Sequence, residues 1–243
     1  MTTTETNYNE LKTNYNQFLT LSKDIGNFFG GPSLHFHNRA LVEREVNFLG
    51  DTHLEMIYAT LTAWGIHRMG ETKTKMVDYT EFKKAILNQQ KTLSELKELR
   101  IEEIKKEDLS NIIGAINTIC FNLKSSASNS FIVGNSKTIA HILPNLVPPI
   151  DRQYTIRFFA TEPTTFLDAK GKFKQVPNFK NNEESEYLIH IMNKTYDFIN
   201  HIKLDPEIKI EQPFNTSLPK IFDNLIVTYI RTVGQNGRKK NGL

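Results

Sequence analysis

The sequence contains a single cysteine, Cys120, and no long run of uncharged apolar residues. One cysteine excludes a disulfide within the chain and is typical of proteins in a reducing compartment. Because Cys120 lies in the apolar run INTICFNL, we expect it to be a core residue. No stretch is long and apolar enough to span a bilayer, and the polar first residues, MTTTETNYNELKTNYNQ, lack the apolar core of a signal peptide. These absences predict a cytoplasmic protein with no membrane partner.

Motifs for cofactor, metal or serine chemistry are also missing. The glycine-rich segment 26–33, GNFFGGPS, lacks the GK[ST] ending of a phosphate-binding loop, and the chain has no GxSxG sequence. His35 and His37 have the spacing of metal ligands on a strand, but no nearby cluster of cysteine or acidic residues completes a site. We therefore expect no cofactor and no metal. The net charge of +3 permits a nucleic-acid partner without requiring one.

What the sequence does have is a helical spacing of apolar residues along most of its length. Thr52 and Glu55 have the spacing of a capping box, and Asp78 offers a start for a second helix. The segment IVTYI is rich in strand-forming residues, but it belongs to a longer helical pattern. The chain is therefore predicted to be all-α, with helical stripes at 52–64, 78–86, 94–108, 110–123, 188–202 and 221–230.

A lysine and an aspartate stand at predicted helix starts in the stretch from Ile132 to Phe159, IVGNSKTIAHILPNLVPPIDRQYTIRFF. We expect Ser136 to be an N-cap, which puts Lys137 at the first helical position of KTIAHIL. A cation at this end of a helix opposes the helix dipole, which disfavours the ammonium form and favours a nucleophilic amine. The alternative is an exposed lysine that reaches into solvent or onto a phosphate.

Asp151 follows VPPI and is predicted to be the N-cap of the helix DRQYTIRFF. The helix dipole keeps a carboxylate in this position ionised. Such a carboxylate can stabilise a positive charge that develops during bond cleavage, or it can orient and deprotonate an attacking water. Capping and catalysis are compatible, because the helix end fixes the position of the carboxylate.

This order of residues resembles the signature of the helix-hairpin-helix DNA glycosylases. In that family a hairpin of the form Gly, apolar, Gly, any residue, Lys, Thr, Ala leads into a helix that carries a catalytic lysine in the bifunctional members, and a Pro-apolar-Asp sequence follows. Here 133–138 keeps only one glycine, shifted by a position, and Asn135 stands where the second would lie. The sequence PID ends at Asp151, and Arg157 comes one residue later than the family's arginine. The resemblance covers about residues 50–160.

The resemblance implies two helical subdomains with a cleft between them and a helix-hairpin-helix element. Residues 51–143 would form a central subdomain that contains the hairpin. Residues 1–50 and 144–243, from both ends of the chain, would fold together as the second.

It also implies how DNA would be bound. Backbone amides of the turn at Gly134, Asn135 and Ser136 would contact a DNA phosphate. The target nucleotide would be flipped into the cleft, where Trp64 and His67 are candidates to stack on the base or read it. The alternatives are core packing for Trp64 and a surface or helix-end position for His67.

Three further basic residues are candidate DNA contacts. Arg157 belongs to the family signature, while Lys172 and Lys174 lie in a long polar loop, 161–184, of a length that is more often functional or mobile than neutral. The lysines could supply phosphate contacts that do not depend on sequence.

We therefore predict a monomeric DNA glycosylase, with or without lyase activity, whose partner is double-stranded DNA containing a modified base. Asp151 would stabilise charge and activate the nucleophile, and Lys137 would form a Schiff base or bind the substrate's phosphate. Two alternatives remain: a non-catalytic helical nucleic-acid-binding module, and a helical interaction domain of a defence system.

Overall fold

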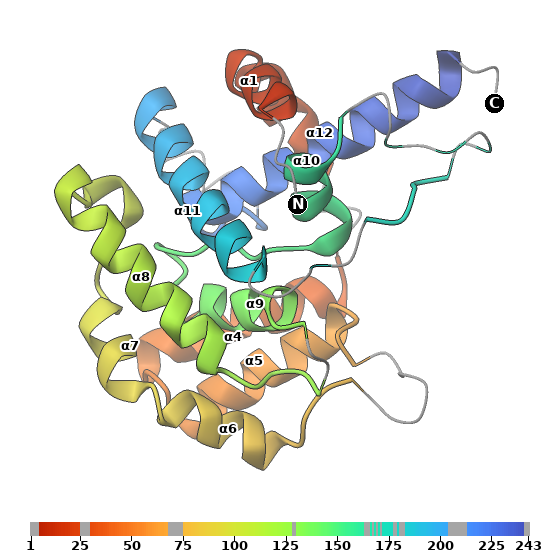
Figure 1. The fold of residues 1–243 in the computed structure, drawn as a ribbon. Coiled ribbons are helices and arrows are strands. Elements are labelled where there is room, and N and C mark those ends of the chain that lie inside the picture. Colours follow the sequence, from red (N-terminus) through yellow and green to blue (C-terminus); the bar gives the residue numbers. More distant parts are fainter. Residues whose placement is uncertain are drawn as a thin grey trace.

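The structure is a computed structural model that describes residues 5–24, 30–67, 75–127, 130–162, 183–203 and 213–240, together with positions 166, 168, 170, 172–176 and 179. Within these residues it contains eleven α-helices and no strand, which confirms the predicted all-α class (Figure 1).

The helices have the following bounds. The N-terminal ones are α1 (Thr6–Thr13), α2 (Tyr15–Leu21), α4 (Pro32–Val46) and α5 (Asp51–Ala63). The middle of the chain forms α6 (Tyr79–Leu87), α7 (Gln90–Leu96), α8 (Lys106–Asn122) and α9 (Ile132–Ile142). A π-helical turn, Arg152–Ile156, leads directly into α10 (Arg157–Ala160), and α11 (Glu183–Ile202) and α12 (Leu218–Lys240) follow.

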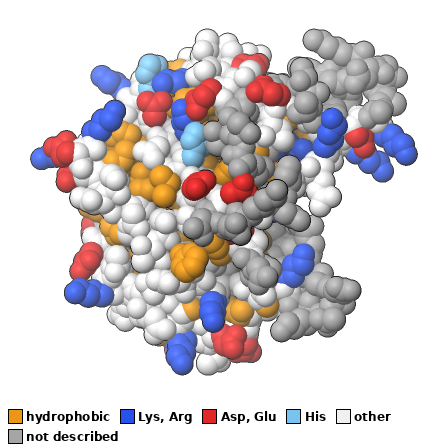
Figure 2. Space-filling view, in the orientation of Figure 1, with side chains coloured by type: hydrophobic (Ala, Val, Ile, Leu, Met, Phe, Trp, Pro, Cys, Tyr) orange, Lys and Arg blue, Asp and Glu red, His pale blue; other side chains and the backbone are white. Residues whose placement is uncertain are grey.

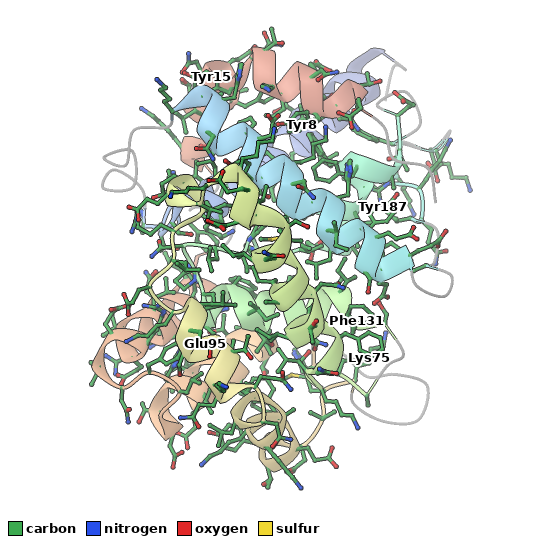
Figure 3. All side chains as sticks on the ribbon, turned by 60° about the vertical axis from the view of Figure 1, so that its left-hand side comes forward. Tyr8, Tyr15, Lys75, Glu95, Phe131 and Tyr187 are labelled. Carbon is green, nitrogen blue, oxygen red and sulfur yellow. The ribbon has the colours of Figure 1, made fainter. Side chains whose placement is uncertain are left out.

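The packing brings the longest helix, α12, into the interior, where residues 218–230 are buried on all sides. This helix contacts α2, α11 and the π-helical turn, while α4 contacts α5 and α9. α8 lies beside α11 and also contacts α9 (Figure 3). In Figure 1, α4 to α7 and α9 gather in the lower part of the molecule, α1, α10, α11 and α12 lie in the upper part, and α8 runs along the left side between them. The largely buried segment 143–151 connects the two groups and delivers Asp151 to the boundary between them.

Two of the predicted helix caps, at Thr52 and Asp78, have different outcomes. The capping box of Thr52 and Glu55 does not form: α5 begins at Asp51, after Gly50, and no side chain caps it. Asp78 is the N-cap of α6, as predicted, because its carboxylate accepts a hydrogen bond from the backbone amide two residues later at 2.8 Å.

The helix predicted over 94–108 is wrong. α7 ends at Leu96, a short 3-10 turn follows, and α8 begins only at Lys106. The amide of Ile101 donates to the carbonyl of Asn145 at 3.0 Å, and the Ile101 side chain is fully buried. This contact with a distant part of the chain draws the backbone into the core and interrupts the helical hydrogen bonding.

Other expectations are confirmed. IVTYI lies within α12, and Cys120 is fully buried in α8. In the part of the chain that the structure describes, no helix has the length and apolar character needed to cross a membrane. On the face drawn in Figure 2, the side chains shown carry both signs of charge, interspersed rather than gathered into one patch.

Candidate active site

Helix α9 starts at Ile132, five residues before the predicted start. The turn expected at Gly134, Asn135 and Ser136 is therefore wrong, because these residues lie inside the helix. The helix can begin early because the carboxylate of Glu184 accepts hydrogen bonds from the first amides, those of residues 131 and 132, at 2.7 and 3.0 Å. A buried carboxylate thus holds the position at this helix end where the resemblance places a DNA phosphate.

The side chains at the start of α9 bind other parts of the protein. A Cβ atom at Gly134 would clash with Ser125 Oγ, so a larger residue here would displace that hydroxyl from its bond with Asn135. Asn135 accepts hydrogen bonds from the amide and hydroxyl of Ser125 and donates to the carbonyls of Cys120 and Leu123. These contacts close the end of α8 against α9.

Ser136, on the same turn, contacts the segment that leads to Asp151. Its hydroxyl accepts a hydrogen bond from the Ile150 amide at 3.1 Å. The side chain is fully buried. The residues expected to form a DNA-binding turn therefore fix the position of Asp151 relative to α9.

Lys137 lies within α9 rather than at its first position, so the argument from the helix dipole does not apply to it. Its side chain is 8% exposed, and its Nζ donates to Asp151 Oδ2 at 2.9 Å. The same nitrogen lies 5.6 Å from the centre of the Trp64 ring. The lysine and the aspartate that the sequence singled out thus form an ion pair against an aromatic face.

Asp151 is an N-cap, as predicted. Its Oδ1 accepts hydrogen bonds from the amides of Gln153 and Tyr154 at 2.7 and 3.3 Å, while Oδ2 faces Lys137. Burial raises the pKa of this carboxyl, but the Lys137 ammonium and the two amides outweigh burial and hold the pKa below its ordinary value. Asp151 is therefore ionised at neutral pH.

A cavity of about 440 Å³ opens beside this pair. Its wall includes Trp64, at the end of α5, and the Lys137–Asp151 pair. The C-terminal part of the chain adds Phe214, Lys220 and Asp223. His67 lies at the exposed rim, where its Nδ1 is 2.7 Å from the carbonyl of Thr62. The structure therefore brings Trp64, His67, Lys137 and Asp151 around one cavity of a size typical of small-molecule sites.

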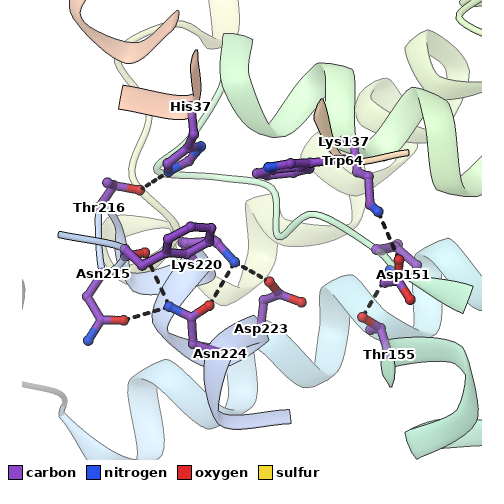
Figure 4. A network of polar contacts seen from close by, with 12 residues as sticks. His37, Trp64, Lys137, Asp151, Thr155, Asn215, Thr216, Lys220, Asp223 and Asn224 are labelled. Atoms are coloured by element: carbon purple, nitrogen blue, oxygen red, sulfur yellow. Dashed lines mark hydrogen bonds and ion pairs between the residues drawn. The ribbon is translucent and has the colours of Figure 1, made fainter. Parts of the chain in front are cut away.

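A second ion pair in this wall was not expected from the sequence. Lys220 Nζ donates to Asp223 Oδ2 at 2.6 Å and to Asn224 Oδ1 at 2.7 Å, and it lies 4.6 Å from the centre of the Phe214 ring (Figure 4). The side chains of Lys220 and Asp223 are only 8% and 7% exposed. Burial lowers the pKa of Lys220 and raises that of Asp223.

The sequence does contain a signal for this pair. Residues 218–230 are buried all round, so any polar side chain among them needs a partner inside the protein. Lys220, Asp223, Asn224 and Thr228 recur at spacings of three and four residues within the apolar run of α12. Such a polar stripe on a helix that is otherwise apolar indicates a buried polar site.

Behind Trp64 lies a chain of hydrogen bonds that includes two buried histidines. His141 Nδ1 donates to the carbonyl of Lys137 at 2.7 Å, so its Nε2 accepts from His37 Nδ1 at 2.9 Å. His37 Nε2 in turn accepts from the hydroxyl of Thr216 at 3.0 Å. Burial lowers the pKa of both rings, to about 4 for His141, so both are neutral. The chain ties α4, α9 and the approach to α12 together beneath the cavity.

The histidine pair considered for a metal lies on a helix, α4, and not on a strand. His37 uses both ring nitrogens within the protein, and His35 is exposed. Among the residues described, no group of three or more metal-ligating side chains gathers.

The three basic candidates for DNA contacts fall into two classes. Arg157 is buried, and its guanidinium donates to the carbonyls of Gln153 and Lys174 at 2.9 and 2.7 Å. Lys172 and Lys174 have exposed side chains. A second hollow of about 480 Å³ lies beside this segment and shares Trp64, Lys137 and Asp151 with the first cavity. The ion pair thus lines both hollows, and the second has more basic side chains in its lining than the first.

Comparison with known proteins finds no protein-family model, no curated protein and no solved structure that matches this chain.

Proposed function

We propose that this protein is a DNA glycosylase, which excises a modified or damaged base by cleaving its N-glycosidic bond after the base has been flipped out of the duplex. The observation that carries the proposal is the Lys137–Asp151 ion pair, 2.9 Å long, in the wall of a cavity that also presents Trp64. An ionised carboxylate, an amine and an aromatic face are the groups that this reaction needs within one small volume.

The subdomain arrangement is part of the same proposal. Residues 51–143 would form one subdomain, and residues 1–50 with 144–243 the other, with the cavity between them. The hairpin element would be α8 and α9 with their connecting segment. The segment that ends at Asp151 supports this arrangement, because it passes from α9 to the second group of helices.

Asp151 would act on the sugar. Cleavage of an N-glycosidic bond leaves positive charge on the anomeric carbon and its ring oxygen, and the bonding electrons depart with the base. The ionised carboxylate would stabilise that charge and orient a water, whose proton it accepts as the new C–O bond forms. The lowered pKa of Asp151 supports the charge-stabilising part of this role, because Lys137 and two backbone amides keep the carboxylate ionised.

Lys137 would act beside it in one of two ways. After transferring a proton to Asp151, its amine could attack the anomeric carbon while the base departs with the bonding electrons and takes that proton, which leads to a Schiff base with the opened sugar. If it stays protonated, it would bind a phosphate of the flipped nucleotide. Trp64 would stack on the base, and Lys172 and Lys174 would bind neighbouring phosphates.

The test compares wild type with Asp151→Asn and Lys137→Ala on duplexes that carry a panel of modified bases, with and without borohydride. Asparagine is also a good N-cap, so Asp151→Asn removes the charge and keeps the helix end. Asp78→Asn is the matched control, because Asp78 also caps a helix and does not line the cavity. We expect Asp151→Asn to lose about a hundredfold or more in base release and the control to match wild type. Borohydride trapping that requires Lys137 would assign the Schiff-base route.

The same ion pair also fits the non-catalytic alternative, because a buried pair can hold α9 against the π-helical turn without taking part in any reaction. Salt-sensitive DNA binding without base release on any substrate would support that module. Absence of DNA binding at low salt would exclude both and leave a helical interaction domain of a defence system. Base release that is unchanged in Asp151→Asn would overturn the assignment of this carboxylate.

A further inference from the structure

The Lys220–Asp223 pair faces the cavity with hydrogen-bonding groups that its internal contacts do not use. An ammonium has three N–H donors, and Lys220 directs two of them to Asp223 and Asn224. Its third N–H has no acceptor among the residues that the structure describes. Asp223 uses Oδ2 for Lys220, and Figure 4 shows the second carboxylate oxygen turned away from the lysine. Among the described residues, a donor and an acceptor without partners therefore stand side by side in the wall.

The pair is held rigidly at the start of α12. Ser217 Oγ accepts from the amide of Lys220 at 3.2 Å, which caps the helix. Asn224 Nδ2 donates to the side-chain oxygen of Asn215 at 2.7 Å and to the carbonyl of Phe214 at 3.2 Å. These bonds fix both the ion pair and the aromatic ring beneath it, which is the preorganisation that a recognition site requires.

The electrostatics favour a ligand that completes both bonds. Burial disfavours each charged form of the pair, and nearby Lys137 and Asp151 add charges of both signs. A neutral ligand that accepts from Lys220 and donates to Asp223 would replace the water that both groups lose, without adding a charge of its own. A ligand without such groups would leave two buried polar groups unpaired.

We propose that Lys220 and Asp223 determine substrate specificity, by reading the edge of a planar heterocycle on which a hydrogen-bond acceptor lies directly beside an N–H donor. Trp64 and Phe214 supply apolar faces at the same end of the cavity. Their ring centres lie 5.8 and 4.6 Å from Lys220 Nζ. The inference rests on the proposed function, because the heterocycle is the base to be excised. It further assigns the recognition of that base to α12, outside the stretch that carries the family resemblance.

Fluorescence can test this directly, because Trp64 is the only tryptophan in the sequence and lines the cavity. The probes are uracil and cytosine, each methylated on the nitrogen that bears the sugar in a nucleoside, and a dimethylated uracil in which the remaining ring N–H is also replaced. The uracil and cytosine probes carry the donor and acceptor in different orders, so the two arms identify which order the pair reads. We expect at least one of them to change the Trp64 emission saturably and the dimethylated probe to bind at least about tenfold more weakly.

The variant is the double substitution Lys220→Met with Asp223→Leu, which leaves no unpaired buried charge. Lys83→Met with Asp51→Leu is the matched control, because that ion pair is exposed and does not line the cavity. Thermal unfolding followed by circular dichroism verifies that both proteins are folded. We expect the cavity variant to bind the preferred probe at least about tenfold more weakly and the control to bind it as wild type does.

Several results would overturn the inference. One is that the dimethylated probe binds as tightly as the preferred monomethylated base. Another is that the folded Lys220→Met/Asp223→Leu variant binds the preferred probe with wild-type affinity. The last is that neither monomethylated base binds. Because these measurements involve no bond cleavage, they are separate from the proposed function. A protein that discriminates the probes but releases no base from any DNA would retain this recognition site and lose the glycosylase assignment.

Discussion

His37 Nδ1 lies 2.9 Å from His141 Nε2, and this bond connects α4 to α9 directly beneath the cavity. Its direction is fixed, because His141 Nδ1 already donates to the carbonyl of Lys137. A proton added to His141 Nε2 would reverse this bond and require His37 to carry its own proton on Nε2, and burial disfavours the added charge. The bond direction described here therefore holds only while His141 is neutral.

The first prediction is that folding stability falls as the pH drops below about 6.5. Burial lowers the pKa of His141 to about 4 in the folded protein, while the unfolded chain keeps the ordinary value. The unfolded state therefore binds the proton first, and stability is lost between about pH 6.5 and pH 4, by ~1.4 kcal/mol per pH unit for each such histidine. Urea unfolding measured at several pH values checks the slope.

His141→Gln should flatten that slope, whereas His35→Gln should not, because His35 is exposed. Equal slopes in wild type and His141→Gln would show that this ring does not control the pH dependence. His37 and His53, whose pKa values burial also lowers, to about 4 for His53, should contribute to the part of the slope that remains.

The second prediction concerns the buried cap of α9. Glu184→Ala removes the acceptor from two backbone amides, those of Phe131 and Ile132, and each amide left unsatisfied costs ~1–3 kcal/mol. We expect the free energy of unfolding, measured with denaturant, to fall by about 2–4 kcal/mol. Glu186→Ala, in the exposed part of the same helical turn, should change it by less than about 0.5 kcal/mol. A loss no larger than in this control would mean that the amides find other partners.

Much of the fold follows from local sequence. The stripes that predicted α5, α8, α11 and α12 are confirmed, because a helix that packs on one or more sides needs apolar residues at its own period. Asp151 and Asp78 are caps as predicted, because a cap depends on the few residues around it.

What the sequence could not show depends on contacts between distant residues. Gly134, Asn135 and Ser136 favour a turn when they are considered alone, but Glu184 caps the preceding amides from 52 residues away. The same kind of contact draws Ile101 out of a predicted helix. Lys220 joins Lys137 at the cavity only because α12 passes through the interior.

The third prediction tests Asn135 as the link between α8 and α9. Asn135→Ala leaves the carbonyls of Cys120 and Leu123 and the amide of Ser125 without their partner in a buried place. We expect a loss of about 3 kcal/mol or more in the free energy of unfolding. Asn193→Ala is the control, since Asn193 is exposed and should cost less than about 1 kcal/mol. A small loss at Asn135 would indicate that water replaces the side chain.

The fourth prediction is that Lys137→Met reverses the sign of the contribution that Asp151 makes to the pH dependence of stability. In wild type the folded pKa of Asp151 lies below its ordinary value, so this carboxylate stabilises the fold above about pH 4 and that stability is lost as the pH falls. Without the ammonium, burial is the largest influence that remains, and it raises the pKa. The folded state then binds the proton more tightly than the unfolded chain, and stability decreases as the pH rises through the raised value.

Urea unfolding of Lys137→Met between about pH 3.5 and pH 7, beside Lys137→Met/Asp151→Asn, isolates this contribution, because asparagine keeps the cap and cannot titrate. We expect the single variant to lose stability toward neutral pH relative to the double variant. Wild type, by contrast, should gain stability toward neutral pH relative to Asp151→Asn. If the single and double variants had parallel profiles, the two amide hydrogen bonds from Gln153 and Tyr154 would suffice to keep Asp151 ionised. The lysine would then be free to act as the amine that the proposed chemistry requires, since the carboxylate would not depend on its charge.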